Sequence, residues 1–130
     1  QAGMKTPAGK QRIVPIHTRV RNLLIKNYKF ALSIGSEYLL NDKGQTHAGS
    51  WKLTYDKYAN RFKKVMAQLN LNPEHRPHDP RITFITRCKK ANVDEYALKE
   101  MVGHSIQDIT ESVYTVRDVE WLRSDLEKMQ

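Results

Sequence analysis

Two histidines, an arginine and a tyrosine in the second half of the sequence could together do chemistry on a phosphodiester. They are His78, Arg81, His104 and Tyr114. A guanidinium can hold two phosphate oxygens at once, and imidazoles can donate hydrogen bonds or transfer protons. A tyrosine phenol can attack phosphorus as a nucleophile. The combination predicts a site that breaks and reseals a phosphodiester bond.

Each of these residues also has a simpler interpretation when it is taken alone. A His-x-x-Arg pair such as His78 and Arg81 is more often an exposed surface pair. His104 could be an ordinary residue at a helix end, and Tyr114 could be a core aromatic with a hydrogen-bonded hydroxyl. The four residues in this order favour a shared site over four separate explanations.

The apolar and turn-forming residues predict a mainly α fold with a small antiparallel β-sheet, which is an α+β class. Residues 4–10 are expected to form a strand end and a turn at Pro7 and Gly9, and residues 11–16 a returning edge strand. A further turn is expected at residues 41–44. Helices are predicted at residues 18–30, 55–69, 81–91, 95–102 and 118–128, with a short helical segment at 108–112.

Polar residues and a glycine mark where these helices begin and end. Thr18, Thr54 and Asp94 are expected to cap helices, and Gly103 is expected to stop one. The helix at 81–91 matters most for the chemistry, because His78 and Arg81 would lie on one side of its beginning. Free N–H groups and the helix dipole attract phosphate at such a position.

Composition narrows the class of partner. Lys and Arg number 22 against 14 Asp and Glu, so the net charge is +8 and the pI is about 9.7. This excess favours an anionic partner, with nucleic acid first and an acidic membrane surface second. In 130 residues, 39% hydrophobic content is enough for one modest core, so one domain or part of one is expected.

The sequence contains neither a membrane-spanning run of about 20 apolar residues nor a signal-peptide pattern. Its single cysteine, Cys88, excludes an internal disulfide and fits a reducing, cytosolic setting. Cys88 could act as a nucleophile, but it shares a predicted helical face with Ile82 and Ile85. Burial is therefore the expected role of this thiol.

The sequence motifs around the four residues resemble those of the catalytic domain of the tyrosine recombinases, the integrases of phages and conjugative transposons. His78-Asp79-Pro80-Arg81 is similar to the family's His-x-x-Arg box, and Val102-Gly103-His104 to its Leu-Gly-His triplet. Residues 108–115 are similar to its nucleophile box. Residues 5–16 resemble the β-hairpin that carries a catalytic lysine, which by position is Lys5 rather than Lys10. The resemblance covers nearly the whole chain.

The resemblance implies a role for each residue. Tyr114 would attack the scissile phosphate and form a 3′-phosphotyrosyl bond. Arg81 and His104 would stabilise charge on the non-bridging oxygens. His78 would assist proton transfer from the tyrosine, and Lys5 would protonate the departing 5′-hydroxyl. No metal and no other cofactor is implied, because the phosphotyrosine conserves the energy of the broken bond.

The implied function is site-specific recombination of double-stranded DNA, namely integration or excision of a mobile element, in the cytoplasm of a bacterial cell at the nucleoid. A non-catalytic basic DNA-binding module is the alternative. A zinc site made of His75, His78 and His104 is a third possibility, which the neighbouring Arg81 would disfavour by repelling a cation. No membrane partner is implied.

The sequence also departs from the family's pattern. Pro80 and Ile82 stand where leucine-like and histidine residues are common, although Pro80 suits the first turn of a helix. The family's first catalytic arginine, in an Arg-x-x-Glu-like word, has no counterpart before Lys5. We therefore expect residues 1–130 to be a piece of the catalytic domain that lacks this arginine and one strand. Loss of one charge-stabilising donor would slow it by ~10²–10³.

The last predicted helix leaves open how the chain associates. Its apolar stripe could pack against its own chain, or on a neighbouring protomer as in the resembled family. The second arrangement would give a homo-oligomer, a tetramer on DNA, joined through the C-terminal helix. The stripe consists of Val119, Leu122, Leu126 and Met129.

Overall fold

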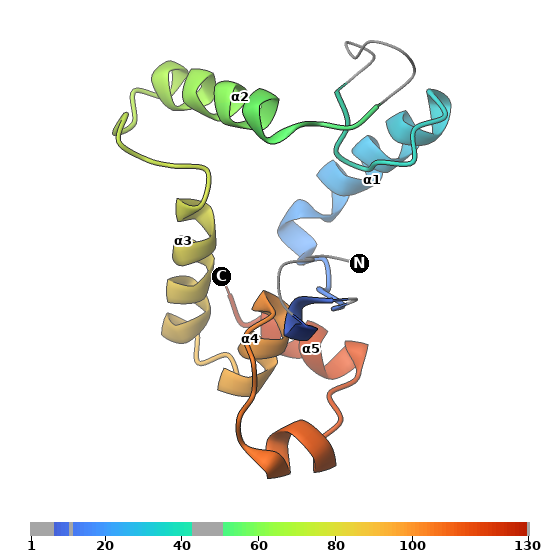
Figure 1. The fold of residues 1–130 in the computed structure, drawn as a ribbon, viewed down its shortest axis with the longest axis vertical. Coiled ribbons are helices and arrows are strands. Elements are labelled where there is room, and N and C mark those ends of the chain that lie inside the picture. The colour runs from blue at the N-terminus through green and yellow to red at the C-terminus, as the bar shows by residue number, and fades with distance from the viewer. Residues whose placement is uncertain (1–6, 11, 43–50, 130) are drawn as a thin grey trace. The chain divides into compact units, whose positions relative to one another are not determined.

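The computed structural model describes residues 7–10, 12–42 and 51–129, and the chain divides into two compact units. Unit 1 comprises Gln1–Arg19 and Ile82–Gln130, and unit 2 comprises Val20–Arg81. The described residues are mainly helical (Figure 1). In chain order the elements are η1 (Pro7–Gly9), α1 (Thr18–Ser33), α2 (Tyr55–Gln68), α3 (Asp79–Lys90), α4 (Glu95–Val102), η3 (Thr110–Tyr114) and α5 (Val119–Leu126).

The predicted capping residues at the beginnings of α2 and α4 and at the end of α4 are confirmed. The Thr54 hydroxyl accepts a hydrogen bond from the Lys57 N–H at 3.4 Å and caps α2. The Asp94 carboxylate accepts from the Ala97 N–H at 2.8 Å and caps α4. α4 then stops at Gly103, as predicted. α3 begins two residues earlier than predicted, which places Pro80 in its first turn, where a missing N–H costs nothing.

The prediction that Thr18 caps α1 is wrong. Thr18 is the first helical residue, and both its N–H and its hydroxyl donate to the Glu127 carboxylate at 2.7 Å. The His17 ring nitrogen Nε2 lies 2.8 Å from the Met129 carbonyl oxygen. Within unit 1, residues 17 and 18 are therefore fastened to the residues after α5.

The expected antiparallel sheet is not formed by the residues that the structure describes. Pro7–Gly9 form a 3₁₀ turn, in agreement with the predicted turn, but residues 13–17 have no regular secondary structure. An isolated antiparallel bridge pairs Asn41 with Lys52. Residues 4–6 and 11 of the expected hairpin, and residues 43–44 of the expected turn, lie outside the described part.

The core of unit 1 joins the second half of α3 to α4 and α5. Cys88 is fully buried there, and burial raises the pKa of its thiol, so this cysteine is a core residue as expected. α5 lies beside α4 (Figure 1), and two leucines of its apolar stripe belong to the same core. Leu122 and Leu126 are buried and Met129 packs against this core, so these three residues of the stripe pack within their own chain.

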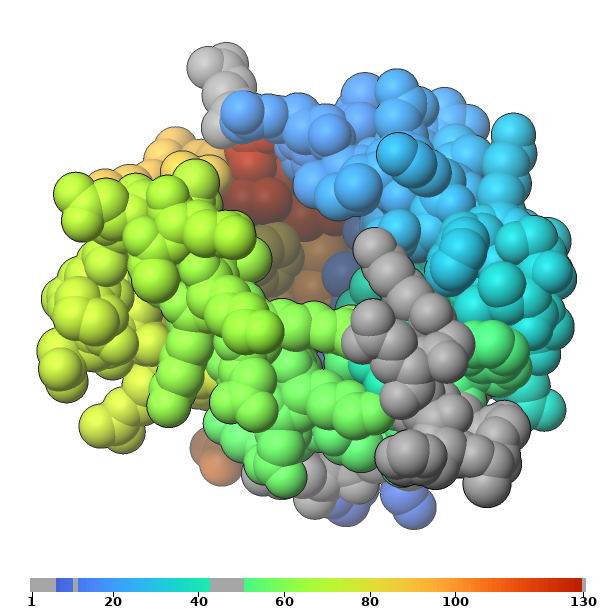
Figure 2. All heavy atoms as spheres, turned by 90° about the horizontal axis from the view of Figure 1, so that it is seen from above, coloured from blue at the N-terminus to red at the C-terminus, as the bar shows by residue number. Residues whose placement is uncertain are grey.

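Unit 2 contains a buried acid that pairs with two basic side chains of α2. Asp42 is 1% exposed and pairs with both Lys57 and Arg61 of α2. The Asp42 N–H donates to the Trp51 carbonyl oxygen at 3.1 Å. Many apolar side chains of α1 and α2 are exposed. Both helices can be seen at the molecular surface in the space-filling view, α1 in blue and α2 in green (Figure 2).

Acid should weaken unit 2 through Asp42. Hydrogen bonding from Lys57, together with the charges of Lys57 and Arg61, lowers the Asp42 pKa below its ordinary value of 3.8, although burial opposes the shift. Because the pKa is lower in the folded state, this contribution is complete above about pH 4 and is lost as the pH falls through the folded value. Urea midpoints at pH 7, 5 and 3, followed by Trp51 fluorescence in Trp121→Phe, should show the drop.

Asp42→Asn is the matched control for this pH effect. It keeps the shape of the side chain, but it removes the titrating charge and replaces one of the two acceptor oxygens by an N–H₂ donor. Its midpoint should therefore be lower at pH 7 and flatter below pH 5. An equally steep acid loss in Asp42→Asn would assign the effect to other carboxylates.

Candidate active site

The beginning of α3 positions His78 and Arg81. His78 directly precedes the helix, and its carbonyl oxygen accepts a hydrogen bond from the Arg81 N–H at 3.0 Å. His78 is exposed and Arg81 is half-buried. The predicted placement of these two residues at a helix N-terminus is therefore confirmed.

Asp79 fastens the preceding loop to this helix end. Its carboxylate accepts from the Arg76 N–H at 2.9 Å, and the His75 Nδ1 lies 3.1 Å from the same oxygen. The hydrogen bond from Arg76, and then that with His75, lower the Asp79 pKa. The proline-rich loop thus ends in a defined geometry next to His78.

The end of α4 positions His104. Gly103 adopts the left-handed conformation with φ 71° and ψ 38°, and its N–H donates to the Glu100 carbonyl oxygen at 3.1 Å. The His104 N–H donates to the Lys99 carbonyl oxygen at 2.9 Å. These bonds are those of a glycine-terminated helix, and they direct His104 out of the helix, where it is exposed.

The segment that resembles the lysine hairpin lies against this turn. A Cβ atom at Gly103 would stand 2.7 Å from Arg12 Nη1 and 2.9 Å from Gly9 Cα. Backbone this close leaves no room for a side chain, so Gly103 is needed for space as well as for its φ. Lys5 itself lies outside the described residues, but Gly9 and Arg12 of the same segment lie beside the turn that carries His104.

Gly103→Ala should therefore destabilise unit 1 by about 2 kcal/mol, since left-handed strain and overpacking act together. Gly35→Ala is the control: Gly35 has a similar φ of 65°, but nothing lies within 4 Å of an added Cβ. Its cost should be about 1 kcal/mol, from the backbone conformation alone. Urea unfolding followed by Trp121 for unit 1 and Trp51 for unit 2 measures both. Equal costs would show that the Arg12 and Gly9 contacts yield easily.

Tyr114 is the last residue of η3, a five-residue π-helical turn. The helical segment predicted at residues 108–112 is thus displaced by two residues toward the tyrosine. Asp108 begins the turn, because its carboxylate accepts from the Glu111 N–H at 3.1 Å. The Thr115 hydroxyl closes the turn on the Thr110 carbonyl oxygen at 3.2 Å. Tyr114 is 78% exposed, which excludes the core-aromatic interpretation within the described chain.

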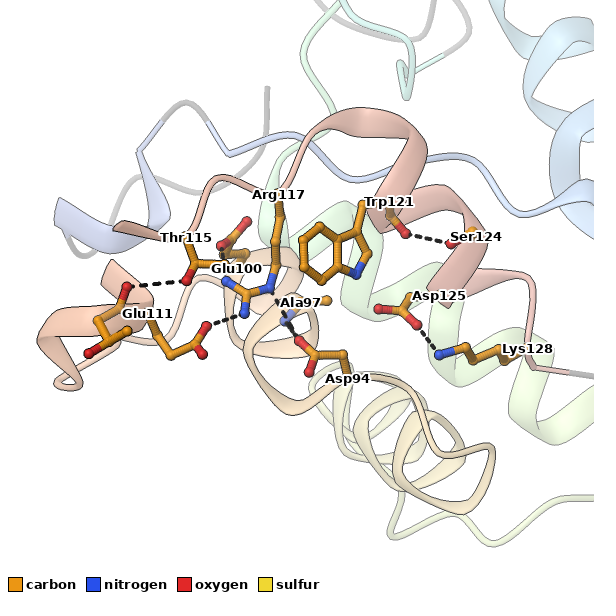
Figure 3. Close-up of polar contacts among 11 residues, drawn as sticks. Asp94, Ala97, Glu100, Glu111, Thr115, Arg117, Trp121, Ser124, Asp125 and Lys128 are labelled. Atoms are coloured by element: carbon orange, nitrogen blue, oxygen red, sulfur yellow. Dashed lines mark hydrogen bonds and ion pairs between the residues drawn. The ribbon is translucent and has the colours of Figure 1, made fainter. Parts of the chain in front are cut away.

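An arginine that the sequence analysis did not identify anchors this region. The Arg117 side chain is 2% exposed and contacts three carboxylates (Figure 3). Its Nε lies 3.2 Å from Asp94 Oδ1, its Nη1 lies 3.3 Å from Glu100 Oε1, and its Nη2 donates to Glu111. These partners lie between 6 and 23 positions from Arg117 along the chain, so no short sequence motif indicates that the four residues form a cluster.

Two aromatic rings complete the surroundings of Arg117. Its Cζ lies 5.4 Å from the centre of the Tyr96 ring and 5.2 Å from that of the Trp121 ring. Burial alone would lower the Arg117 pKa, but the hydrogen bond to Glu111 and the charges of the carboxylates raise it. The guanidinium therefore remains charged and compensated in an enclosed position.

The candidate residues are divided between the two units. His78 and Arg81 belong to unit 2, whereas His104 and Tyr114 belong to unit 1. The structure gives the geometry of each pair by itself. His78 and Arg81 lie at the N-terminus of α3, whereas His104 and Tyr114 lie on exposed turns that follow α4. A helix N-terminus with an arginine can hold a phosphate, and an exposed phenol can reach one.

Unit 1 also carries a basic hollow near the end of α3. It is open, has a volume of about 440 Å³, and is lined by Arg87, Lys90, Ala91, Lys128 and Met129. Three cationic side chains around one hollow suit an anionic partner. One of them, Lys128, also pairs with the buried Asp125.

In residues 7–10, 12–42 and 51–129, no three side chains of His, Cys, Asp or Glu gather so that they could hold a metal ion. Of the helices in this described part, none combines the length and the apolar character needed to cross a membrane.

Comparison with known proteins assigns the chain to a family. The sequence model described as "Phage integrase family" matches residues 4–120, which include every candidate site residue. No curated protein and no solved structure matches the chain. Since the family match extends over most of the 130 residues, the chain belongs to the phage integrase family, whose members are tyrosine recombinases.

Proposed function

We propose that the chain cuts and rejoins DNA strands with Tyr114 as the nucleophile. The observation that carries this proposal is the placement of Tyr114: it is 78% exposed, at the end of a turn fastened on both sides, in a chain of a family that performs site-specific recombination. Attack by the phenol oxygen on a phosphodiester would form a 3′-phosphotyrosyl bond and release a 5′-hydroxyl. The reverse reaction with another strand's 5′-hydroxyl completes recombination.

The other candidates would stabilise or protonate groups in this reaction. Arg81 and His104 would donate hydrogen bonds to the non-bridging oxygens, where negative charge develops. His78 would accept the phenol proton, and Lys5 would give a proton to the departing 5′-oxygen. The exposed ring of His104 and the position of Arg81 at the beginning of α3 support these roles. Lys5 would belong to the small antiparallel sheet that the family resemblance implies, although residues 13–16 form no strand of it here.

The DNA partner is supported by the family and by the charge of +8. The basic hollow of Arg87, Lys90 and Lys128 offers one place for the phosphate backbone. We also propose assembly into a tetramer on DNA, although Leu122 and Leu126 of α5 are occupied within their own chain and would not form its interface. As a recombinase of a mobile element, a phage or a conjugative transposon, the protein would work at the nucleoid of a bacterial cell.

Covalent trapping on DNA tests the proposal. A pool of nicked duplexes with randomised sequence around the nick serves as substrate, because release of the short strand makes cleavage irreversible and lets slow adducts accumulate. We expect a denaturation-resistant protein–DNA adduct, with the phosphodiester remnant on the peptide that contains Tyr114 in mass spectrometry. DNA binding that falls steeply with salt but gives no adduct would instead identify the chain as a non-catalytic DNA-binding module.

A further inference from the structure

The Arg117 cluster closes a loop around the proposed nucleophile. Glu111 precedes Tyr114 by three residues, and Arg117 follows it by three. The pair between Glu111 and Arg117 therefore joins the two ends of the segment on which Tyr114 stands (Figure 3). A pair that closes so short a loop restricts the backbone conformations open to the residues between.

The same guanidinium ties this loop to the core of unit 1. Asp94 caps α4 and Glu100 lies within α4, and both contact Arg117. α4 contributes Ala97 and Leu98 to the core, and both are buried. The tyrosine segment is thus linked through one enclosed side chain to a rigid, packed helix.

The tyrosine segment has no apolar anchor of its own. η3 contains no buried residue, and the apolar side chains from residue 109 to residue 116 are all exposed: Ile109, Val113, Tyr114 and Val116. Burial of apolar side chains is what usually holds a helix in place. Within the described chain, the position of this segment therefore depends on hydrogen bonds and ion pairs. Among these, the ion pair with Arg117 involves a buried side chain.

We propose that Arg117 is a positioning residue for Tyr114, acting through Glu111. The inference rests on the proposed function for its catalytic meaning, but its structural content can be tested separately. The pair would hold the phenol oxygen in the geometry for in-line attack, and small displacements of a reacting group are costly in rate. Arg117 itself does not touch the reacting atoms.

Glu111→Gln is the most selective test, because it is isosteric and leaves Asp94 and Glu100 paired with Arg117. It replaces the ion pair with Arg117 by a hydrogen bond from the same guanidinium to an uncharged amide oxygen, at only one end of the loop. Hydrogen exchange of the amides of residues 110–116 should become roughly tenfold faster, while the amides of α4 and α5 keep their rates. At saturating DNA, the rate of adduct formation should fall roughly tenfold with DNA affinity unchanged.

Glu120→Gln is the matched control. Glu120 also pairs with an arginine, Arg123 at 3.5 Å, but this pair is exposed and lies on α5 away from Tyr114. The same chemical change should leave both the exchange rates and the adduct rate unaltered.

The outcomes separate this inference from the proposed function. Faster exchange confined to residues 110–116 together with a slower adduct rate supports both. Faster exchange in that segment, when even the native chain forms no adduct, supports the fastening and overturns the proposed function. Unchanged exchange, exchange that rises throughout unit 1, or an unchanged adduct rate in Glu111→Gln overturns the positioning role.

Discussion

Tyr114→Phe should abolish covalent attachment to DNA while leaving DNA binding intact. The substitution removes only the phenol oxygen, which is the proposed nucleophile, and phenylalanine offers no atom that could replace it. The ring is 78% exposed, so no packed contact depends on the hydroxyl. Stability should therefore stay within about 0.5 kcal/mol of the native chain. Adduct formation on nicked DNA and DNA affinity at several salt concentrations measure the two properties.

Tyr55→Phe controls for the loss of an exposed tyrosine hydroxyl. Tyr55 is also well exposed and begins α2 in unit 2, and no role in the reaction is proposed for it. Its adduct rate should equal that of the native chain. If Tyr114→Phe still formed an adduct, another residue would be the nucleophile, and if Tyr114→Phe lost DNA affinity as well, the tyrosine would contribute to binding rather than to chemistry.

Arg117→Ala should lower the free energy of unfolding of unit 1 by about 3–5 kcal/mol, because removal of one member of a buried ion cluster leaves its partners uncompensated. Three carboxylates would then face one another across the cavity left by the guanidinium. The contacts of Arg117 with Tyr96 and Trp121 are lost as well. Solvent can reach the carboxylates, which are partly exposed, so a value near the lower limit is expected. Urea unfolding followed by Trp121 fluorescence in Trp51→Phe provides the measurement.

A double-mutant cycle tests the electrostatic origin of this loss. In the Glu111→Gln background one of the three negative charges is absent, so Arg117→Ala should cost less there than in the native chain. Arg123→Ala is the control for removing an arginine, because its pair with Glu120 is exposed, and it should cost under about 0.5 kcal/mol. Additive costs in the cycle would indicate that Arg117 stabilises unit 1 through packing on the aromatic rings instead.

Local signals in the sequence were sufficient for most helix ends. Thr54, Asp94 and Gly103 make their capping hydrogen bonds within four residues of their own position. The residues that end each of these helices can therefore be recognised from the neighbouring sequence. Thr18 shows the limit of this reasoning. It is a good capping residue by type, but Glu127 captures both of its donors from 109 positions away, and only the folded chain brings that acceptor near.

In the candidate site, too, features set by neighbouring residues were predicted, whereas contacts between distant residues were not. The types and spacing of His78, Arg81, His104 and Tyr114 were enough to predict the family, which the match over residues 4–120 confirms. Arg117 was not found, because its three partners come from two other segments and no short motif connects them. The small sheet stays a prediction, since Lys5 and part of the expected hairpin lie outside the described residues.

By itself, the sequence determined the family, the identity of the groups proposed for the chemistry, and those helix ends that are fixed by neighbouring residues, such as the ones at Thr54, Asp94 and Gly103. Only the tertiary structure decided that Tyr114 is exposed, that three residues of the α5 stripe pack within their own chain, and that Arg117 fastens the tyrosine segment to α4. The physical reason is that burial and ion pairing depend on distance in space. Side chains far apart in the sequence acquire these energies only when the chain has folded.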